Sequence, residues 1–165
     1  MRQPGDLTAL RPEVSLREIT DANRAEVLRP AVSPEQRNFV DGVAESVHEA
    51  AETPEARPWF RAIYADETPV GFVMITDGIP VGHPSYEWPY YLWRLLIGAE
   101  HQRRGYGTAA LDLVVEYVRT RPGAVELVTS AVPGRGSPTS FYERYGFRAT
   151  GGMLDGEHVY ALPLE

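Results

Sequence analysis

The sequence contains no cysteine among its 165 residues. This absence excludes disulfide bonds, thiolate metal sites and a cysteine nucleophile. There are only four histidines, at positions 48, 83, 101 and 158, and they lack the spacing of a metal site, so no metal is expected. No apolar run approaches the roughly 18 residues that span a bilayer, and the N-terminus lacks the apolar core of a signal peptide. We therefore expect a cytoplasmic protein without a membrane partner.

Basic residues are also scarce. Sixteen Lys and Arg residues stand against 23 Asp and Glu residues, which gives a formal net charge of −7. Nonspecific binding of nucleic acid needs a broad basic face, so no nucleic-acid partner is expected. The same net charge favours a cationic small substrate, because opposite charges attract as the two molecules approach.

The length and the hydrophobic content of 43% predict one globular domain. Residues 1–13 are polar and contain two prolines, which indicates a flexible N-terminal arm ahead of a single domain over residues 14–165. The periodicity of apolar residues predicts the element order β-α-β-β-β-α-β-α-β-β. This order implies an α/β (α+β) domain with one mixed, mostly antiparallel central sheet flanked by helices. The expected strands are 14–20, 59–65, 70–76, 90–97, 125–131, 147–150 and 158–164; the expected helices start at Pro34 (about four turns), end at Arg119, and run from Ser137 to Gly146.

Two neighbouring segments stand out in this pattern. Residues 77–89 form a long loop with three prolines and two glycines, and such a loop is either a functional flap or a tolerated insertion. The strand that follows, residues 90–97, is aromatic and almost wholly apolar, which is typical of a central, buried strand.

The turn after that strand is the most informative part of the chain. Gly105 and Gly107 lie where a helix begins, and Arg103 and Arg104 precede them. The first N–H groups of a helix have no intrahelical acceptors and the helix dipole is positive there, so an anion such as phosphate is stabilised. A tight turn followed by solvated arginines is the plain structural alternative.

The same turn also fits a second phosphate-binding pattern. Residues 105–110 match the relaxed dinucleotide motif G-x-G-x-x-A. That motif requires an acidic residue at the end of the next strand, whereas Glu126 lies at the start of that strand. Dinucleotide binding is therefore the weaker interpretation.

The segment Gln102-Arg-Arg-Gly105-Tyr-Gly107 resembles the pyrophosphate loop, Gln/Arg-x-x-Gly-x-Gly/Ala, of the GCN5-related N-acetyltransferases (GNAT family). About 35 residues later, residues 137–147 resemble the closing helix of that family, with its aromatic pair and Gly-Phe ending. The order of elements is also that of the family, and the resemblance covers roughly residues 14–164. Within that family, residues 16–20, the helix start Glu35-Gln36, and Gly151-Gly152 with Gly156-Glu157 resemble the polyamine acetyltransferases of the bacterial spermine/spermidine type.

The resemblance implies that acetyl-CoA is the co-substrate. The glycine loop would bind its pyrophosphate, while the backbone of the preceding strand would pair with the pantetheine arm and polarise the thioester carbonyl. Many relatives place an asparagine before the closing helix, but this chain has none there, and Ser137, which also fits a helix N-cap, is the polar candidate. The implied cofactor-binding residues are Leu95, Leu96, Ile97, Gln102, Arg103, Arg104, Gly105, Tyr106, Gly107, Thr108 and Ser137.

The resemblance further implies that Tyr142 is the general acid. A phenol with a pKa near 10 can protonate a departing thiolate without being ionised at neutral pH. The alternative is an aromatic helix face packed in the core, which is our interpretation of Tyr145. The general base stays open among water and five carboxylates: Glu18, Glu26, Glu45, Asp77 and Glu87.

The expected acceptor is a primary amine of a small, cationic, polyamine-like molecule that attacks acetyl-CoA directly in a ternary complex. Aromatic faces attract cations, and the aromatic residues near the expected hairpin and loop are Trp59, Trp88, Tyr90, Tyr91 and Trp93. An antibiotic or a protein N-terminus as acceptor stays open, and so does a non-catalytic acyl-CoA-binding or sensing module. A homodimer through the edge of the last strands is a further expectation.

Overall fold

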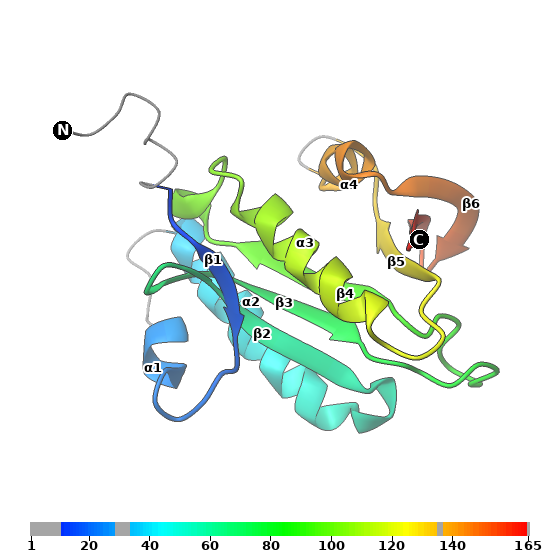
Figure 1. Ribbon diagram of the computed structural model, residues 1–165, viewed down its shortest axis with the longest axis horizontal. Coiled ribbons are helices and arrows are strands. Elements are labelled where there is room, and N and C mark those ends of the chain that lie inside the picture. Colours follow the sequence, from blue (N-terminus) through cyan, green and yellow to red (C-terminus); the bar gives the residue numbers. More distant parts are fainter. Residues whose placement is uncertain (1–10, 29–33, 135–136, 165) are drawn as a thin grey trace.

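The computed structural model describes residues 11–28, 34–134 and 137–164, with the side chains of the second helix from residue 42 onward. Within these residues, seven strands form two antiparallel sheets, and four α-helices pack around them (Figure 1). The predicted N-terminal arm, residues 1–13, lies almost wholly outside this described part. The helices are α1 (Arg24–Val27), α2 (Pro34–Glu52), α3 (Tyr106–Arg119) and α4 (Thr139–Tyr145).

The first sheet has four antiparallel strands in the order β1-β2-β3-β4. Its centre is the predicted hairpin of β2 and β3, which turns through Asp66 with a positive φ of 51°. The four strands are β1 (Val14–Arg17), β2 (Pro58–Ala65), β3 (Thr68–Thr76) and β4 (Leu92–Ile97).

Helices cover both faces of this sheet, and the alternation along β3 shows how. Val73 and Ile75 belong to the cluster that includes α3, whereas Phe72 and Met74 belong to the cluster that includes α2. In Figure 1, α3 lies in front of the sheet and α2 behind it. Because both faces are buried, β3 carries an almost continuous apolar sequence. Helix α2 is longer than predicted, at 19 residues, and α1 was not predicted.

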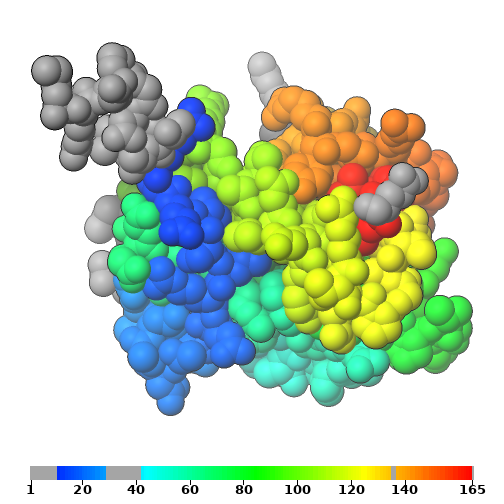
Figure 2. All heavy atoms as spheres, viewed as in Figure 1, coloured from blue at the N-terminus to red at the C-terminus, as the bar shows by residue number. Residues whose placement is uncertain are grey.

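The second sheet has three antiparallel strands in the order β5-β7-β6. Helix α4 lies between β5 and β6 in the chain and packs through Tyr142 into the same core as α3. Figure 2 shows α3 (yellow-green) between the N-terminal strand β1 (blue) and the C-terminal segments (orange and red). The strands are β5 (Glu126–Ala131), β6 (Arg148–Leu154) and β7 (Glu157–Pro163), and two short 3-10 helices are η2 (Pro54–Ala56) and η3 (Ala99–His101).

The fold class and the predicted order of the main elements are confirmed. The predicted single central sheet is divided into two sheets, of four and three strands. Among the described residues, the two halves share one isolated bridge, which is parallel and joins Tyr91 to Val128. The prediction of a central, buried strand over residues 90–97 was wrong, because β4 is an edge strand of its own sheet and is half-buried beyond Leu92. Its apolar pattern arises from helices on both faces while one edge stays open. No described helix has both the length and the apolar character needed to cross a membrane.

Candidate functional site

The strands β4 and β5 separate immediately after the point where they meet. The Val128 N–H donates to the Tyr90 carbonyl at 3.0 Å, and the Thr129 hydroxyl donates to the Leu92 carbonyl at 3.1 Å. From there to the end of β4, the strand register is shared with β3 alone. The predicted residues Leu95, Leu96 and Ile97 therefore lie on a strand whose second edge is open to an extended ligand.

The glycine loop is held against the end of this open edge. The Gln102 side-chain amide donates to the Ile97 carbonyl at 2.9 Å, which fixes where the loop leaves β4. Arg103 and Gly105 both adopt positive φ, at 64° and 83°. The space around Gly105 is open, with no heavy atom within 4 Å of where a Cβ would lie. The loop thus bends sharply and presents its backbone to the surface.

The first N–H groups of α3 have no capping side chain to accept their hydrogen bonds. Its N-cap is Gly105, no side chain caps it, and its first turn contains no acidic residue. The N–H groups of Tyr106, Gly107 and Thr108 therefore point outward with the positive end of a 14-residue helix. The Tyr106 side chain is buried in the core, so that residue offers only its backbone. Arg103 and Arg104 are exposed nearby. This geometry suits a diphosphate group.

Tyr142 lies on α4 and is 7% exposed. Its ring packs against Phe141 and Phe147 at centroid distances of 5.6 Å and 5.4 Å. Burial raises the pKa of Tyr142 above the ordinary tyrosine value, while the neighbouring Thr129 side chain lowers it by a smaller amount. The phenol therefore keeps its proton at neutral pH, as a general acid must.

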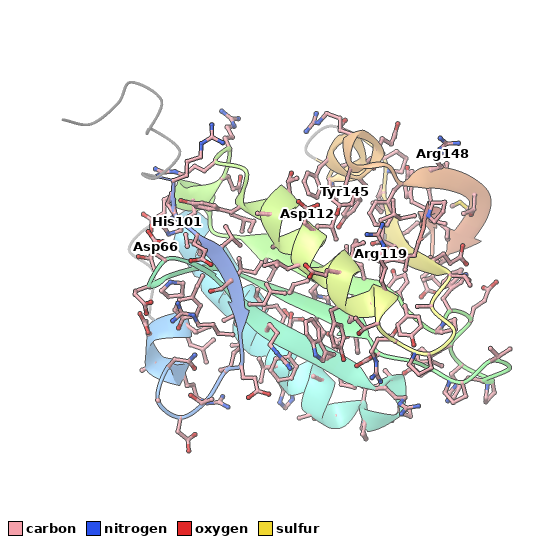
Figure 3. All side chains as sticks on the ribbon, in the orientation of Figure 1. Asp66, His101, Asp112, Arg119, Tyr145 and Arg148 are labelled. Carbon is pink, nitrogen blue, oxygen red and sulfur yellow. The ribbon has the colours of Figure 1, made fainter. Side chains whose placement is uncertain are left out.

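Tyr145, on the same helix, has a different role. Its hydroxyl donates to the Asp112 carboxylate at 2.7 Å and so links α4 to α3 (Figure 3). Desolvation and this carboxylate both raise the pKa of Tyr145. The structure agrees with its interpretation as a packing residue.

A cavity of about 1050 Å³ opens beside Tyr142. Residues of the long loop 77–89 form one wall, β4 and β5 form another, and the turn between β6 and β7 closes a third side. The loop is held by N–H groups of Gly78 and Ile79, which both donate to the Pro89 carbonyl. The structure thus places loop 77–89, for which the sequence left a functional flap and a tolerated insertion open, on the cavity that the candidate acid also lines.

The lining of this cavity is acidic and aromatic. Its carboxylates are Glu49, Glu87, Asp155 and Glu157, and its one arginine among the described residues, Arg94, forms an ion pair with Glu49 at 3.1 Å. The rings of Trp88 and Tyr91 stack with centroids 5.9 Å apart, and Tyr86 and Trp93 add further aromatic surface. Such a lining suits a cation.

Two of the predicted aromatic residues lie elsewhere. Trp59 of β2 stacks on Tyr117 of α3, with ring centroids 4.4 Å apart. Tyr90 is buried and donates its hydroxyl to the Pro122 carbonyl at 2.6 Å. Both pack against the main core, and neither lines the cavity.

The predicted base candidates are dispersed, and only Glu87 lines the cavity. Glu18 pairs with Arg61 at 3.6 Å, Glu26 accepts from Tyr64 at 3.4 Å, and Glu45 is exposed on α2. Asp77 accepts from the Tyr117 hydroxyl at 2.5 Å and from Arg121 at 2.9 Å. Burial and Asp77 raise the pKa of Tyr117 to about 12.

Sequence reasoning missed Glu157. This carboxylate lines the cavity and accepts a hydrogen bond from the Ser130 hydroxyl at 2.6 Å. Ser130 in turn bonds to the Tyr91 hydroxyl. Glu157 belongs to a segment that resembles the polyamine acetyltransferases, but no local signal joins it to Ser130 and Tyr91, since the three residues come from separate segments of the sequence.

Ser137 does not cap α4 as predicted. The helix begins at Thr139 with Pro138 as N-cap, and the Ser137 hydroxyl accepts from the Thr139 N–H at 3.2 Å. A cofactor contact by Ser137 stays a prediction. Among the described residues, no three His, Asp or Glu side chains gather as a metal site would require.

Comparison with known proteins shows the family of this chain. The family model described as acetyltransferase (GNAT) family matches residues 16–147. A spermine/spermidine N(1)-acetyltransferase of Bacillus subtilis (strain 168) is 22% identical over 152 residues, which cover 92% of this chain and 99% of the relative.

Solved structures share the fold. An acetyltransferase from Thermus thermophilus has a TM-score of 0.64 at 21% identity, covering 92% of this chain and 97% of that one. PaiA N-acetyltransferase from Thermoplasma acidophilum, in complex with coenzyme A, has a TM-score of 0.62 at 15% identity, covering 92% and 99%. With most of its domain matched by the family model, the chain belongs to the GNAT family of acetyltransferases.

Proposed function

We propose that this protein transfers the acetyl group of acetyl-CoA to a primary amine of a small, polyamine-like cation. The observation that carries the proposal is one juxtaposition: buried Tyr142 lies at an acidic, aromatic cavity beside the open edge of β4. A cation-binding cavity and a protonated phenol at the end of a thioester groove are what amine acetylation requires.

The chain fits coenzyme A at two places. The uncapped N-terminus of α3, with Arg103 and Arg104 nearby, would hold the pyrophosphate through the N–H groups of residues 105–108 and their positive dipole. The open edge of Leu95, Leu96 and Ile97 would pair with the amide groups of the pantetheine arm. Bound there, acetyl-CoA supplies an activated acetyl thioester, and a backbone N–H of β4 would stabilise charge on its carbonyl oxygen.

Tyr142 would act at the sulfur. The packing of its ring by Phe141 and Phe147 fixes the phenol, and burial keeps it protonated. Its O–H would donate a proton to the departing thiolate. The proposed role is supported by the cavity lining, because Tyr142 shares it with Leu92 and Arg94 of β4.

The acceptor class follows from the cavity's charge. Its carboxylates outnumber its single described arginine, which is already paired with Glu49. A molecule with two or more ammonium groups would be attracted by this excess and by the stacked Trp88 and Tyr91. The named substrates of the Bacillus subtilis relative, spermine and spermidine, belong to this class.

The test is thiol release from acetyl-CoA over a panel of acceptors: spermidine, an aminoglycoside, a peptide with a free N-terminus and an arylamine. The proposal predicts the highest kcat/KM with spermidine. Coenzyme A binding without thiol release for any amine would instead identify a sensing module, while preference for the peptide or the aminoglycoside would overturn the acceptor class. The proposed homodimer through β6, an exposed edge strand, is tested by sedimentation of the protein alone.

A further inference from the structure

Three hydrogen-bonded polar side chains line one side of the cavity, next to Trp88 of the loop. This hydrogen-bonded chain consists of Tyr91, which precedes β4, Ser130 on β5 and Glu157 at the start of β7. All three line the cavity that Tyr142 also lines. They are 39 and 27 positions apart in the sequence, so only the fold brings them together.

The direction of the hydrogen bonds in this chain can be derived. A serine hydroxyl carries one hydrogen, and that of Ser130 is donated to Glu157 at 2.6 Å. Tyr91 must then donate its own hydrogen to the Ser130 oxygen. The Tyr91 oxygen is left with lone pairs only, so toward the cavity it can accept a hydrogen bond but cannot donate one.

The surroundings favour a cation at that oxygen. The Tyr91 ring stacks on Trp88, and the charged groups facing Tyr91 are Glu157 and Asp155 from the β6–β7 turn and Arg94 from β4. Since Arg94 pairs with Glu49, the two carboxylates dominate this side of the cavity. An ammonium group is the donor that an acceptor-only phenol in this setting would bind best.

We propose that Tyr91 binds the acceptor ammonium, and that Ser130 and Glu157 carry its proton away, with Glu157 as the final base. This inference rests on the proposed acetyl transfer and names a base that the predicted candidates did not include. It assigns Tyr91 as the group that contacts the acceptor, and Ser130 and Glu157 as residues that act through it.

Every proton in the proposed transfer is accounted for. The ammonium gives one proton to the Tyr91 oxygen as Tyr91 gives its own to Ser130 and Ser130 gives its own to Glu157. Both hydroxyl groups end neutral, the amine is free, and the carboxylate is protonated. The amine then forms the N–C bond while the C–S bond breaks. Sulfur takes the proton of Tyr142, which recovers one from the acetylated nitrogen. Glu157, partly exposed, returns its proton to water.

The decisive variant is Glu157→Gln, because the amide oxygen still accepts the Ser130 hydrogen bond but has no useful basicity. With spermidine, kcat/KM at pH 7 should fall about 100-fold, within the range of general base catalysis. It should then rise about tenfold per pH unit toward the pKa of the amine, since only the neutral amine reacts. An arylamine, already neutral at pH 7, should lose less than about threefold. Equal losses for both amines, or no loss, would overturn the inference.

Asp155→Asn is the matched control. It removes the same unit charge from the same turn, but Asp155 is outside the hydrogen-bonded chain. Asp155→Asn should raise KM for spermidine while the pH profile of kcat keeps the wild-type shape. If the pH profile of Asp155→Asn matched that of Glu157→Gln, the loss of a negative charge would explain the effect, and proton transfer through Tyr91, Ser130 and Glu157 would not.

Tyr91→Phe provides a second and independent readout. It keeps the stack on Trp88 and removes the accepting oxygen. Calorimetry of spermidine binding to the protein without any thioester should show affinity about tenfold weaker, the loss of one hydrogen bond to a charged group. The double variant with Glu157→Gln should be no slower than either single variant, because both break one path. Unchanged spermidine binding in Tyr91→Phe would refute the assignment of Tyr91, whether or not the wild type is active. A wild type that is inactive with every amine would refute the proposed function alone.

Discussion

Removal of one oxygen atom, by Tyr142→Phe, separates chemistry from packing at the candidate site. The ring keeps its contacts with Phe141 and Phe147, and no cavity is created. The substitution removes a neutral hydroxyl that contributes about one hydrogen bond, so we expect the free energy of unfolding to change by about 1 kcal/mol or less. For a chain of 165 residues this is a shift in Tm of at most about 4 °C.

The effect on turnover should be far larger. Without the phenol the thiolate must leave unprotonated or take a proton from water, so kcat should fall by about 10²- to 10⁴-fold. The loss should shrink with an acetyl donor whose thiol is more acidic. The Kd of acetyl-CoA should change by less than about threefold, since its binding rests on β4 and the N-terminus of α3. In the wild type, kcat should not decline on account of Tyr142 below about pH 10, because burial raises its pKa above the ordinary value.

Tyr145→Phe is the matched control on the same helix. It removes the hydrogen bond to Asp112 at 2.7 Å, which should cost about 1 kcal/mol of stability, and it should leave kcat unchanged. Stopped-flow thiol release and thermal unfolding of both variants make the comparison. A Tyr142→Phe protein with near-normal kcat, or a Tyr145→Phe protein that is equally slow, would refute the assignment of the acid.

Further results are expected for three other residues and for the salt dependence of the reaction. Gly107→Glu should abolish measurable coenzyme A binding in calorimetry, whereas Gly107→Ala should fold and bind, because its Cβ would meet Phe141 at an ordinary 3.5 Å; retained affinity in Gly107→Glu would remove the pyrophosphate from this helix. Asp77→Asn should lower stability by about 1–3 kcal/mol without changing kcat, since its partners are Tyr117 and Arg121; a large loss of kcat in a folded variant would contradict this structural role. The raised pKa of Tyr117, about 12, adds stability that is fully present below about pH 10 and is lost as pH rises through 12, so Tyr117→Phe should flatten alkaline denaturation in that window, and an unchanged curve would speak against it. Rising salt should lower kcat/KM for spermidine but not for a neutral arylamine, because charges are screened beyond about 8–10 Å near physiological salt, and equal responses would exclude steering by the net charge of −7.

Local signals explain which features could be predicted from the sequence. The glycine loop, the start of α3 and the end of α4 at Gly146 depend on neighbouring residues, and the structure places each within a few positions. The β2–β3 hairpin follows from alternation and a short turn. The positive φ of Arg103, 64°, could not be predicted, because arginine rarely adopts this conformation and its presence gives no indication of it.

The parts that could not be predicted depend on contacts between distant segments. The separation of β4 from β5 cannot be predicted from an apolar sequence. A strand covered by helices on both faces has the same apolar residues whether it lies at the edge or in the centre of a sheet. Glu157 and Ser130 are joined by strand pairing between β5 and β7, so no local pattern links them. Alternation could not tell that Trp59 packs on Tyr117 under α3, because it does not say which face meets which helix.

A crystal structure of the protein with coenzyme A would show whether the thioester sulfur reaches Tyr142. We predict the pyrophosphate on the N–H groups of residues 105–108, the pantetheine arm along Leu95–Ile97, and the sulfur within about 3.5 Å of the Tyr142 hydroxyl oxygen, a distance at which a proton can be transferred. A complex in which the diphosphate binds away from α3, or in which the sulfur lies outside hydrogen-bond reach of Tyr142, would contradict the account.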